Sequence, residues 1–282
     1  MNDQPTGVDS RRAQQALRVG AGSTDPDVLL ETRNVAISFG QVRALQGASI
    51  TARRGEVTAI VGDNGAGKST LIRCVSGIHR ADSGEIWFDG SQVAFHSPQS
   101  AREAGIETVH QNLALVEDLT VWQNLFLNRE LSRGVGPFKL LDRARMKKEA
   151  ERMVSTLAVN VPAVGSRVRR LSGGQRQAVS ICRAAGFDSK LVIMDEPTAA
   201  LGVQETARVE ELILRLRDEG HAIVLISHNF AQVLTLSDAV WVMRSGRAVV
   251  GRRTKHTTGD EIVALITGAD PGDLGVAESE QT

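Results

Sequence analysis

The sequence contains few cysteines and carries no net charge, and each absence excludes a class of protein. Only two of its 282 residues are cysteines. Cys74 and Cys182 lie within apolar, periodic segments, so they indicate small core residues in a reducing compartment rather than a disulfide framework. Lysine plus arginine number 33, as do aspartate plus glutamate. This balance gives no electrostatic footprint for duplex DNA, and we predict no nucleic-acid partner.

A long hydrophobic run is also missing. Residues 1–30 carry several charges and lack the apolar region of a secretion signal. The longest stretch without acidic or basic residues, 220–237, has Ser227, His228 and Asn229 near its middle, and lipid would leave such groups poorly satisfied. We therefore predict a buried strand, a polar loop and a short helix there, in a soluble protein.

The apolar residues, 41% of the chain, are enough for one large α/β domain. Continuous apolar strands followed by helical patterns indicate a parallel sheet that is covered on both faces. Three segments are apolar on both faces, namely residues 57–61, 191–194 and 222–226. Alternation and short apolar runs predict further strands near residues 29–39, 44–51, 85–88, 106–109, 240–243 and 248–250.

The segment from about residue 98 to residue 188 has few strand signals. A helix is predicted to begin at Asp142. Its apolar face would carry Met146, Ala150, Met153, Val154 and Leu157. We infer a mostly helical subdomain inserted into the α/β core, so the predicted fold has a mostly parallel sheet, an antiparallel β region and this insertion.

The predicted boundaries divide the chain into a leader, one domain and a tail. Residues 1–27 and 271–282 are polar and are expected to be flexible. The domain between them spans residues 28–270, with its core at about 28–97 and 189–270 and its helical subdomain at about 98–188.

A glycine-rich turn directly follows the first buried strand. Its residues fit the pattern G-x-x-x-x-G-K-[ST], and helical spacing follows it, which is the context that a phosphate-binding P-loop requires. Glycines let backbone N–H groups wrap around phosphate oxygens, Lys68 supplies a positive charge, and the Ser69 hydroxyl can bind Mg²⁺. The predicted nucleotide-binding residues here are Gly62, Asp63, Asn64, Gly65, Ala66, Gly67, Lys68, Ser69 and Thr70. The alternative is a chance match, which average residue frequencies give in roughly one chain of this length per hundred.

Two carboxylates, Asp195 and Glu196, stand where another buried strand ends. Ligands of open α/β sheets bind at the carboxyl ends of strands, so this end should face the P-loop. Asp195 is then a candidate for holding Mg²⁺, and Glu196 for activating a water that attacks the γ-phosphate. The alternative is an ordinary polar strand exit.

A second glycine-containing turn, Ser172-Gly173-Gly174-Gln175, opens a later helix. Ser172 and Gln175 fit a capping box, which would be a purely structural role. A cap does not require Gly173 and Gly174, which each cost roughly 1 kcal/mol of helix stability. Close approach to an anion explains them better. One nucleotide already has a P-loop, so a second anion-binding helix start suggests two chains that meet head-to-tail, each covering its partner's nucleotide.

These three motifs together resemble the nucleotide-binding domain of ATP-binding cassette (ABC) proteins, over about residues 29–269. The resemblance implies an ATPase with Lys68, Glu196 and His228 as catalytic residues, the last binding the γ-phosphate. It implies that Gln111 contacts Mg²⁺, together with Ser69 and Asp195, and senses a membrane partner. It also implies that an aromatic ring, often tyrosine, stacks on adenine. The chain has no tyrosine, and Phe39 is the natural substitute. The alternative is that Phe39 is a core aromatic residue at a strand end.

One position departs from the family pattern. The segment after Glu196 ends in Gly202, where the family usually has aspartate. Gly202 cannot make a side-chain contact across the dimer, which puts the coupling between the two ATP sites in question. A nucleotide-binding module that no longer cycles is therefore one alternative function.

The detailed sequences in and around these motifs resemble those of bacterial monosaccharide importers, of the single-cassette, fructose type. This resemblance implies membrane permease subunits as separate partners, an extracytoplasmic solute-binding protein, a second copy of the chain, and a peripheral position on the cytoplasmic face of the membrane. A soluble ABC-type ATPase with a regulatory or DNA-repair role is the alternative.

Overall fold

The computed structural model describes residues 25–133 and 140–269. The predicted tail and all but three residues of the predicted leader lie outside this part of the chain. The division into core and helical subdomain stays a prediction, whereas the α/β fold can be compared with the structure directly.

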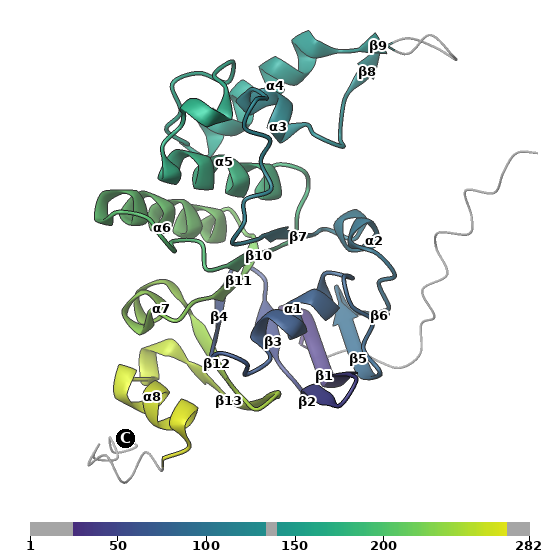
Figure 1. Cartoon of the computed structure of the whole chain (residues 1–282), viewed down its shortest axis with the longest axis vertical. Helices are drawn as coiled ribbons and strands as arrows, with labels where there is room; N and C mark the ends of the chain where they lie inside the picture. Colours follow the sequence, from purple (N-terminus) through teal and green to yellow (C-terminus); the bar gives the residue numbers. More distant parts are fainter. Residues whose placement is uncertain (1–24, 134–139, 270–282) are drawn as a thin grey trace, which may run out of the picture.

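A six-stranded sheet forms the centre of the molecule (Figure 1). Its strands, in spatial order, are β13 (Arg247–Arg253), β12 (Ala239–Arg244), β4 (Val57–Val61), β11 (Ala222–Ile226), β10 (Leu191–Asp195) and β7 (Ile106–Val109). All neighbours are parallel except β12 and β13. Every residue of β4 and β11 is buried, as continuous apolar strands between two helical layers require.

A second, antiparallel sheet flanks the first. Its path is β2 (Val42–Ala48), β1 (Val28–Phe39), β5 (Ser83–Phe88) and β6 (Ser91–Val93), and β3 (Thr51–Arg53) pairs with β1. The single strand predicted near residues 44–51 is therefore wrong. Thr32 breaks it into two, because its hydroxyl donates to Ala48 O at 3.3 Å and accepts from Ile50 N–H at 3.0 Å in place of regular ladder bonds.

The helices lie on both sides of the larger sheet. They are α1 (Lys68–Val75), α2 (Pro98–Glu103), α3 (Val121–Leu125), α4 (Arg143–Thr156), α5 (Gly173–Ala185), α6 (Val203–Asp218), α7 (Phe230–Leu236) and α8 (Gly259–Thr267), with short 3₁₀ turns at Val168–Arg170 and Thr254–His256. Among the described residues, none of these helices is both long and apolar enough to cross a bilayer.

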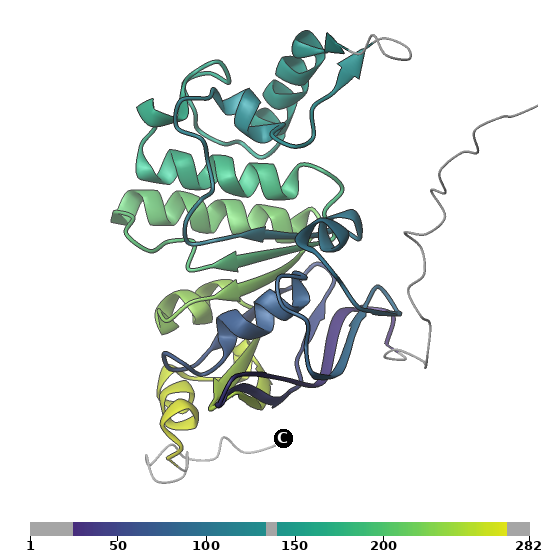
Figure 2. The same ribbon diagram turned by 45° about the vertical axis from the view of Figure 1, so that its right-hand side comes forward.

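The helical part of the fold stands at one end of the molecule. Helices α3, α4 and α5 gather there, beside a small hairpin of β8 (Ser132–Arg133) and β9 (Leu140–Leu141), and α6 lies alongside α5 (Figure 2). The predicted start of α4 is confirmed, since the Asp142 carboxylate accepts from Arg145 N–H. Strand β7 lies within the predicted helical subdomain but pairs with β10 at the edge of the central sheet.

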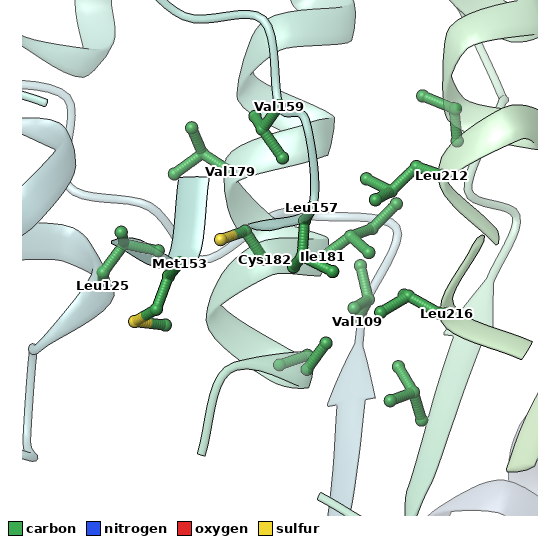
Figure 3. Packing of buried hydrophobic residues seen from close by; sticks show 14 of the residues in the cluster. Val109, Leu125, Met153, Leu157, Val159, Val179, Ile181, Cys182, Leu212 and Leu216 are labelled. Atoms are coloured by element: carbon green, nitrogen blue, oxygen red, sulfur yellow. The ribbon is translucent and has the colours of Figure 1, made fainter. Parts of the chain in front are cut away.

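One apolar cluster joins the helices to this sheet. Its buried side chains come from the helices α3 to α6 and from strands that include β7, β10 and β11. Among them are Val109, Ile181, Leu212 and Leu216 (Figure 3). Cys182 lies in the same cluster, and burial raises the pKa of its thiol to about 12. Cys74 is also buried, with a thiol pKa raised to about 11. Both thiols are free, as expected for core residues.

Candidate active site

A cavity of about 530 Å³ opens at the carboxyl ends of β4, β10 and β11. Because these strands are parallel, their ends share one edge of the sheet, where ligands of α/β folds bind. Its size is typical of a site for a small organic molecule. The cavity is lined by Val42, Arg43, Ala44, Asn64, Gly65, Ala66, Gly67, Lys68, Ser69, Thr70, Gln111, Asp195, Glu196, Ile226 and His228. The structure thus brings together most residues predicted to bind nucleotide, metal and the attacking water.

Two glycines allow the P-loop to take its path. Gly62 has φ +148°, and a Cβ there would lie 2.2 Å from Met243 O. Gly67 has φ +100°, and its Cβ would lie 2.8 Å from Ala44 O. Helix α1 starts directly after Gly67, and no side chain of the described residues caps it. The first N–H groups of α1 are therefore left for an anion, which the helix dipole also favours.

Lys68 reaches back over this loop. Its Nζ donates to Gly62 O at 2.5 Å and to Asp63 O at 3.0 Å. Loss of solvent lowers the pKa of its ammonium, and the negative charges of Glu196, Asp195 and Asp63 oppose that change. The ammonium is thus held at the cavity by the loop that would carry the phosphates.

The two carboxylates leave β10 in different environments. Burial is the main cause that raises the pKa of Asp195, and the charge of Glu196 adds to it. Glu196 has φ +53°, and its N–H donates to Ile226 O at 3.0 Å on the neighbouring strand. The Glu196 carboxylate lies 2.7 Å from His228 Nδ1. The Glu196 side chain is only 18% exposed, whereas the His228 side chain is 76% exposed. Glu196 is therefore fixed from two sides, whereas most of the His228 ring faces the solvent.

The residues that line the cavity fit a magnesium ion bound together with phosphates. Ser69, Gln111 and Asp195 offer oxygen atoms, which hard divalent cations prefer. Burial and the charge of Glu196 keep the pKa of Asp195 raised although His110, Lys68 and Arg73 lower it, so nearby cations compensate its negative charge only in part. Within residues 25–133 and 140–269, no group of three or more His, Cys, Asp or Glu side chains could hold a metal by itself, so phosphate or water oxygens would have to complete the coordination.

The predicted adenine platform stands beside the cavity rather than in its wall. Phe39 ends β1, is 46% exposed, and meets the ring of His79 edge-on at 5.1 Å. It pairs with Val42 in the β1–β2 ladder, and Val42 lines the cavity. Stacking of adenine on Phe39 stays a prediction. The three β2 residues of the wall were missed because nothing in their sequence marks them, apart from their closeness to Phe39.

The signature turn, Ser172–Gln175, lies elsewhere. The predicted capping box is present: Ser172 N–H donates to Gln175 Oε1 at 3.0 Å, and Gln175 N–H donates to Ser172 Oγ at 3.3 Å. The turn borders a second hollow, formed with α6 and residues 157–160. Among the described residues, the two hollows share no lining residue. The signature turn of one chain is therefore not part of that chain's own nucleotide cavity.

Glu205 of α6 supplies a reason for Gly174 that the sequence did not reveal. A Cβ on Gly174 would lie 2.8 Å from Glu205 Cβ. The Glu205 carboxylate accepts hydrogen bonds from the Ser172 side chain and from Gly174 N–H, and these bonds lower its pKa. Packing against α6 thus requires a glycine at position 174, and an anion already lies at the start of α5.

Comparison with known proteins agrees with this geometry. Residues 45–199 match the model of the ABC transporter family. The xylose/arabinose import ATP-binding protein XylG of Sulfolobus acidocaldarius is 41% identical over 250 residues, which are 89% of this chain and 98% of that protein. The fructose import ATP-binding protein FrcA of Rhizobium meliloti is 46% identical over 245 residues, which are 86% of this chain and 94% of that protein.

Solved structures agree as well. The ADP conformation of MJ1267, an ATP-binding cassette of an ABC transporter, is similar with a TM-score of 0.72 at 27% identity, covering 90% of this chain and 99% of that one. The predicted α/β fold of the P-loop type is confirmed by this likeness. A P-loop after β4, a carboxylate pair at the end of β10 and a separate signature turn are thus found together in a chain that belongs to the ABC transporter family.

Proposed function

We propose that the chain is the ATP-hydrolysing subunit of an importer for a monosaccharide, acting on separate membrane permease subunits. The observation that carries this proposal is the cavity that places the P-loop, Gln111, Asp195, Glu196 and His228 around one space. The names of XylG and FrcA, which this chain matches over nearly their whole length, support the sugar as cargo.

In the proposed mechanism, the N–H groups of the P-loop and the start of α1 bind the phosphates. Lys68 leaves its contacts with Gly62 O and Asp63 O and binds the β- and γ-phosphates. Glu196 takes a proton from the water that attacks the γ-phosphorus, and His228, already 2.7 Å from Glu196, binds the γ-phosphate. A magnesium ion held by Ser69, Gln111 and Asp195 would neutralise charge that develops on the phosphates.

The active unit in this proposal is a head-to-tail dimer. The nucleotide cavity and the signature turn lie in separate hollows, so one chain cannot cover its own γ-phosphate with its own signature turn. A second copy supplies Ser172, Gly173, Gly174 and Gln175. When the dimer closes on ATP, it changes the conformation of the permease, and hydrolysis of the ATP reopens the dimer.

The remaining partners follow from the same proposal. The permease subunits dock near the Gln111 region and the helical part of the fold. The chain then lies on the cytoplasmic face of the membrane, and an extracytoplasmic binding protein delivers the sugar.

Reconstitution tests the proposal directly. The chain is coexpressed with candidate permease subunits and a candidate binding protein from the same organism, and ATP hydrolysis is measured in proteoliposomes with xylose, arabinose, fructose or ribose. We expect one of these sugars with its binding protein to raise turnover, and Glu196→Gln to abolish it. Hydrolysis that nucleic acid stimulates and that sugar and permease leave unchanged would contradict the import role and favour a soluble ATPase.

A further inference from the structure

The carboxyl-terminal part of α5 holds the chain segment that follows Gln111. Arg183 Nη1 donates to Ala114 O at 2.9 Å, and its Nη2 donates to Leu113 O at 3.2 Å. Ser180, one turn earlier on α5, donates from its hydroxyl to the same Leu113 O at 3.2 Å. Three hydrogen bonds from one helix therefore bind two consecutive carbonyl groups of this segment.

The segment needs such support. Ala114 has φ +49°, a left-handed conformation that alanine rarely adopts. Its side chain is exposed, and that of Leu113 is half-buried, so packing alone holds the segment weakly. Gln111 lies two residues before Leu113 and lines the nucleotide cavity. Because charged donors make the stronger hydrogen bonds, the position of these carbonyls depends chiefly on Arg183.

Helix α5 is anchored firmly enough to transmit a movement. Next to Arg183, Ile181 and Cys182 are fully buried, among side chains of β7 and α6 (Figure 3). Glu107, whose negative charge acts on Arg183, is ion-paired with Arg129. The same helix begins with the signature turn, about 16 Å from Arg183 at 1.5 Å per residue. A shift of the Gln111 segment would thus move the whole helix, including Ser172.

We propose that Arg183 is a positioning residue that links the Gln111 segment of one ATP site to the signature turn of the other. The inference rests on the proposed function, in which Gln111 faces the chain's own nucleotide and Ser172 faces the partner's nucleotide. Nucleotide bound at the P-loop then changes how this chain presents its signature turn to the second site. Arg183 touches neither nucleotide and acts through the two carbonyl groups.

Hydrogen exchange of the full chain tests this link. The ligand is magnesium with the β,γ-imido analogue of ATP, at a protein concentration where sedimentation shows a monomer. In the unsubstituted protein we expect the analogue to slow exchange in residues 111–115 and in residues 172–177. In Arg183→Met, residues 111–115 should exchange about tenfold faster without ligand, since hydrogen bonds to a charged donor are lost. The response of residues 172–177 should disappear, with the affinity for the analogue kept within about twofold.

Two further variants make the result specific. Arg183→Lys keeps a charged donor and should restore part of the response in residues 172–177. Arg244→Met is the matched control, because Arg244 of β12 also donates to a backbone carbonyl, Leu265 O at 3.4 Å, and lines neither the nucleotide cavity nor the hollow beside the signature turn. Its response should equal that of the unsubstituted protein. If Arg183→Met does not fold, Arg183→Lys and Ser180→Ala should each show a weakened response.

The outcomes separate the two proposals. An unchanged response of residues 172–177 in every foldable variant at Arg183 and Ser180 would overturn the link, as would no response in the unsubstituted protein that binds the analogue. Failure of the unsubstituted protein to bind the analogue at all would instead overturn the proposed function.

Discussion

The variant Gly174→Ala tests whether packing against α6 is the reason for the glycine at position 174 of the signature turn. The added Cβ would lie 2.8 Å from Glu205 Cβ, 3.0 Å from its Cγ and 3.2 Å from its Cδ. Rotation of the Glu205 side chain moves Cγ and Cδ but leaves Cβ, which is attached to the backbone of α6. The helix α6 or the start of α5 must therefore shift.

The expected size follows from two opposing effects. Overpacking costs about 1–3 kcal/mol, and the better helix propensity of alanine returns at most about 1 kcal/mol. We expect Gly174→Ala to lower the free energy of unfolding by about 1–2 kcal/mol, and the melting temperature by about 2–6 °C for a chain of this size. Urea unfolding and calorimetry of the nucleotide-free protein measure both quantities.

The neighbouring glycine is the matched control. A Cβ on Gly173 would meet only the end of the Leu201 side chain, at 3.3 Å, and Glu205 Oε2 at 3.7 Å. Gly173→Ala should therefore be neutral or slightly stabilising. Adding Glu205→Ala to Gly174→Ala should restore only part of the loss, because the Cβ contact remains. If Gly174→Ala alone is as stable as the unsubstituted protein, packing against α6 does not require the glycine, and access for an anion is left as its explanation.

Three further predictions concern the nucleotide cavity. Glu196→Gln should keep ATP binding, abolish turnover and favour an ATP-held dimer; near-normal phosphate release would remove Glu196 as the base. Lys68→Ala should weaken nucleotide binding by at least about tenfold, as expected for losing a charged contact; unchanged affinity in calorimetric titration would contradict its role. Asp195 has a raised pKa, so its ionisation destabilises the metal-free fold as pH rises above the ordinary value of 3.8. Asp195→Asn should raise the melting temperature of the nucleotide-free protein at pH 7, and this gain should vanish below pH 3.8. In the presence of ATP, the variant should lose the further increase in melting temperature that magnesium gives to the unsubstituted protein. A lower melting temperature of the variant at pH 7 would refute this.

Much of the fold could be predicted from the sequence, because the signals are local. Strands that are buried on both faces have nearly continuous apolar sequences. The residues of β11 are all apolar, β4 has Thr58 as its one polar residue, and β10 is apolar up to Asp195. The start of α4 follows from Asp142 and the apolar spacing after it. The break between β2 and β3 was missed because it depends on hydrogen bonds of Thr32, which lies 16 residues from Ala48 in the chain.

Some residues of the candidate site could likewise be predicted from the sequence, and others could not. Its motif residues could be placed around one cavity, because parallel strands bring their carboxyl ends to the same edge. The β2 part of the wall could not be predicted, since Val42, Arg43 and Ala44 contribute by position alone. The contact between Arg183 and the segment after Gln111 spans about 70 residues of sequence, and neither partner is unusual within its own segment.

Glu205 shows why a motif can be recognised correctly and explained incompletely. The two glycines of the signature turn suggested an anion, and the structure does place one there, but it is a carboxylate of the same chain. A phosphate that is to reach Ser172 and Gly174 N–H competes with hydrogen bonds that Glu205 already makes. Displacing this carboxylate costs those bonds, so in the proposed dimer the Glu205 side chain must rotate away from Ser172 and Gly174 before a partner's phosphate binds there. Helix α6, which carries Glu205, begins directly after Gly202, so six residues of backbone separate it from Glu196, the proposed base, and connect the two sites within one chain.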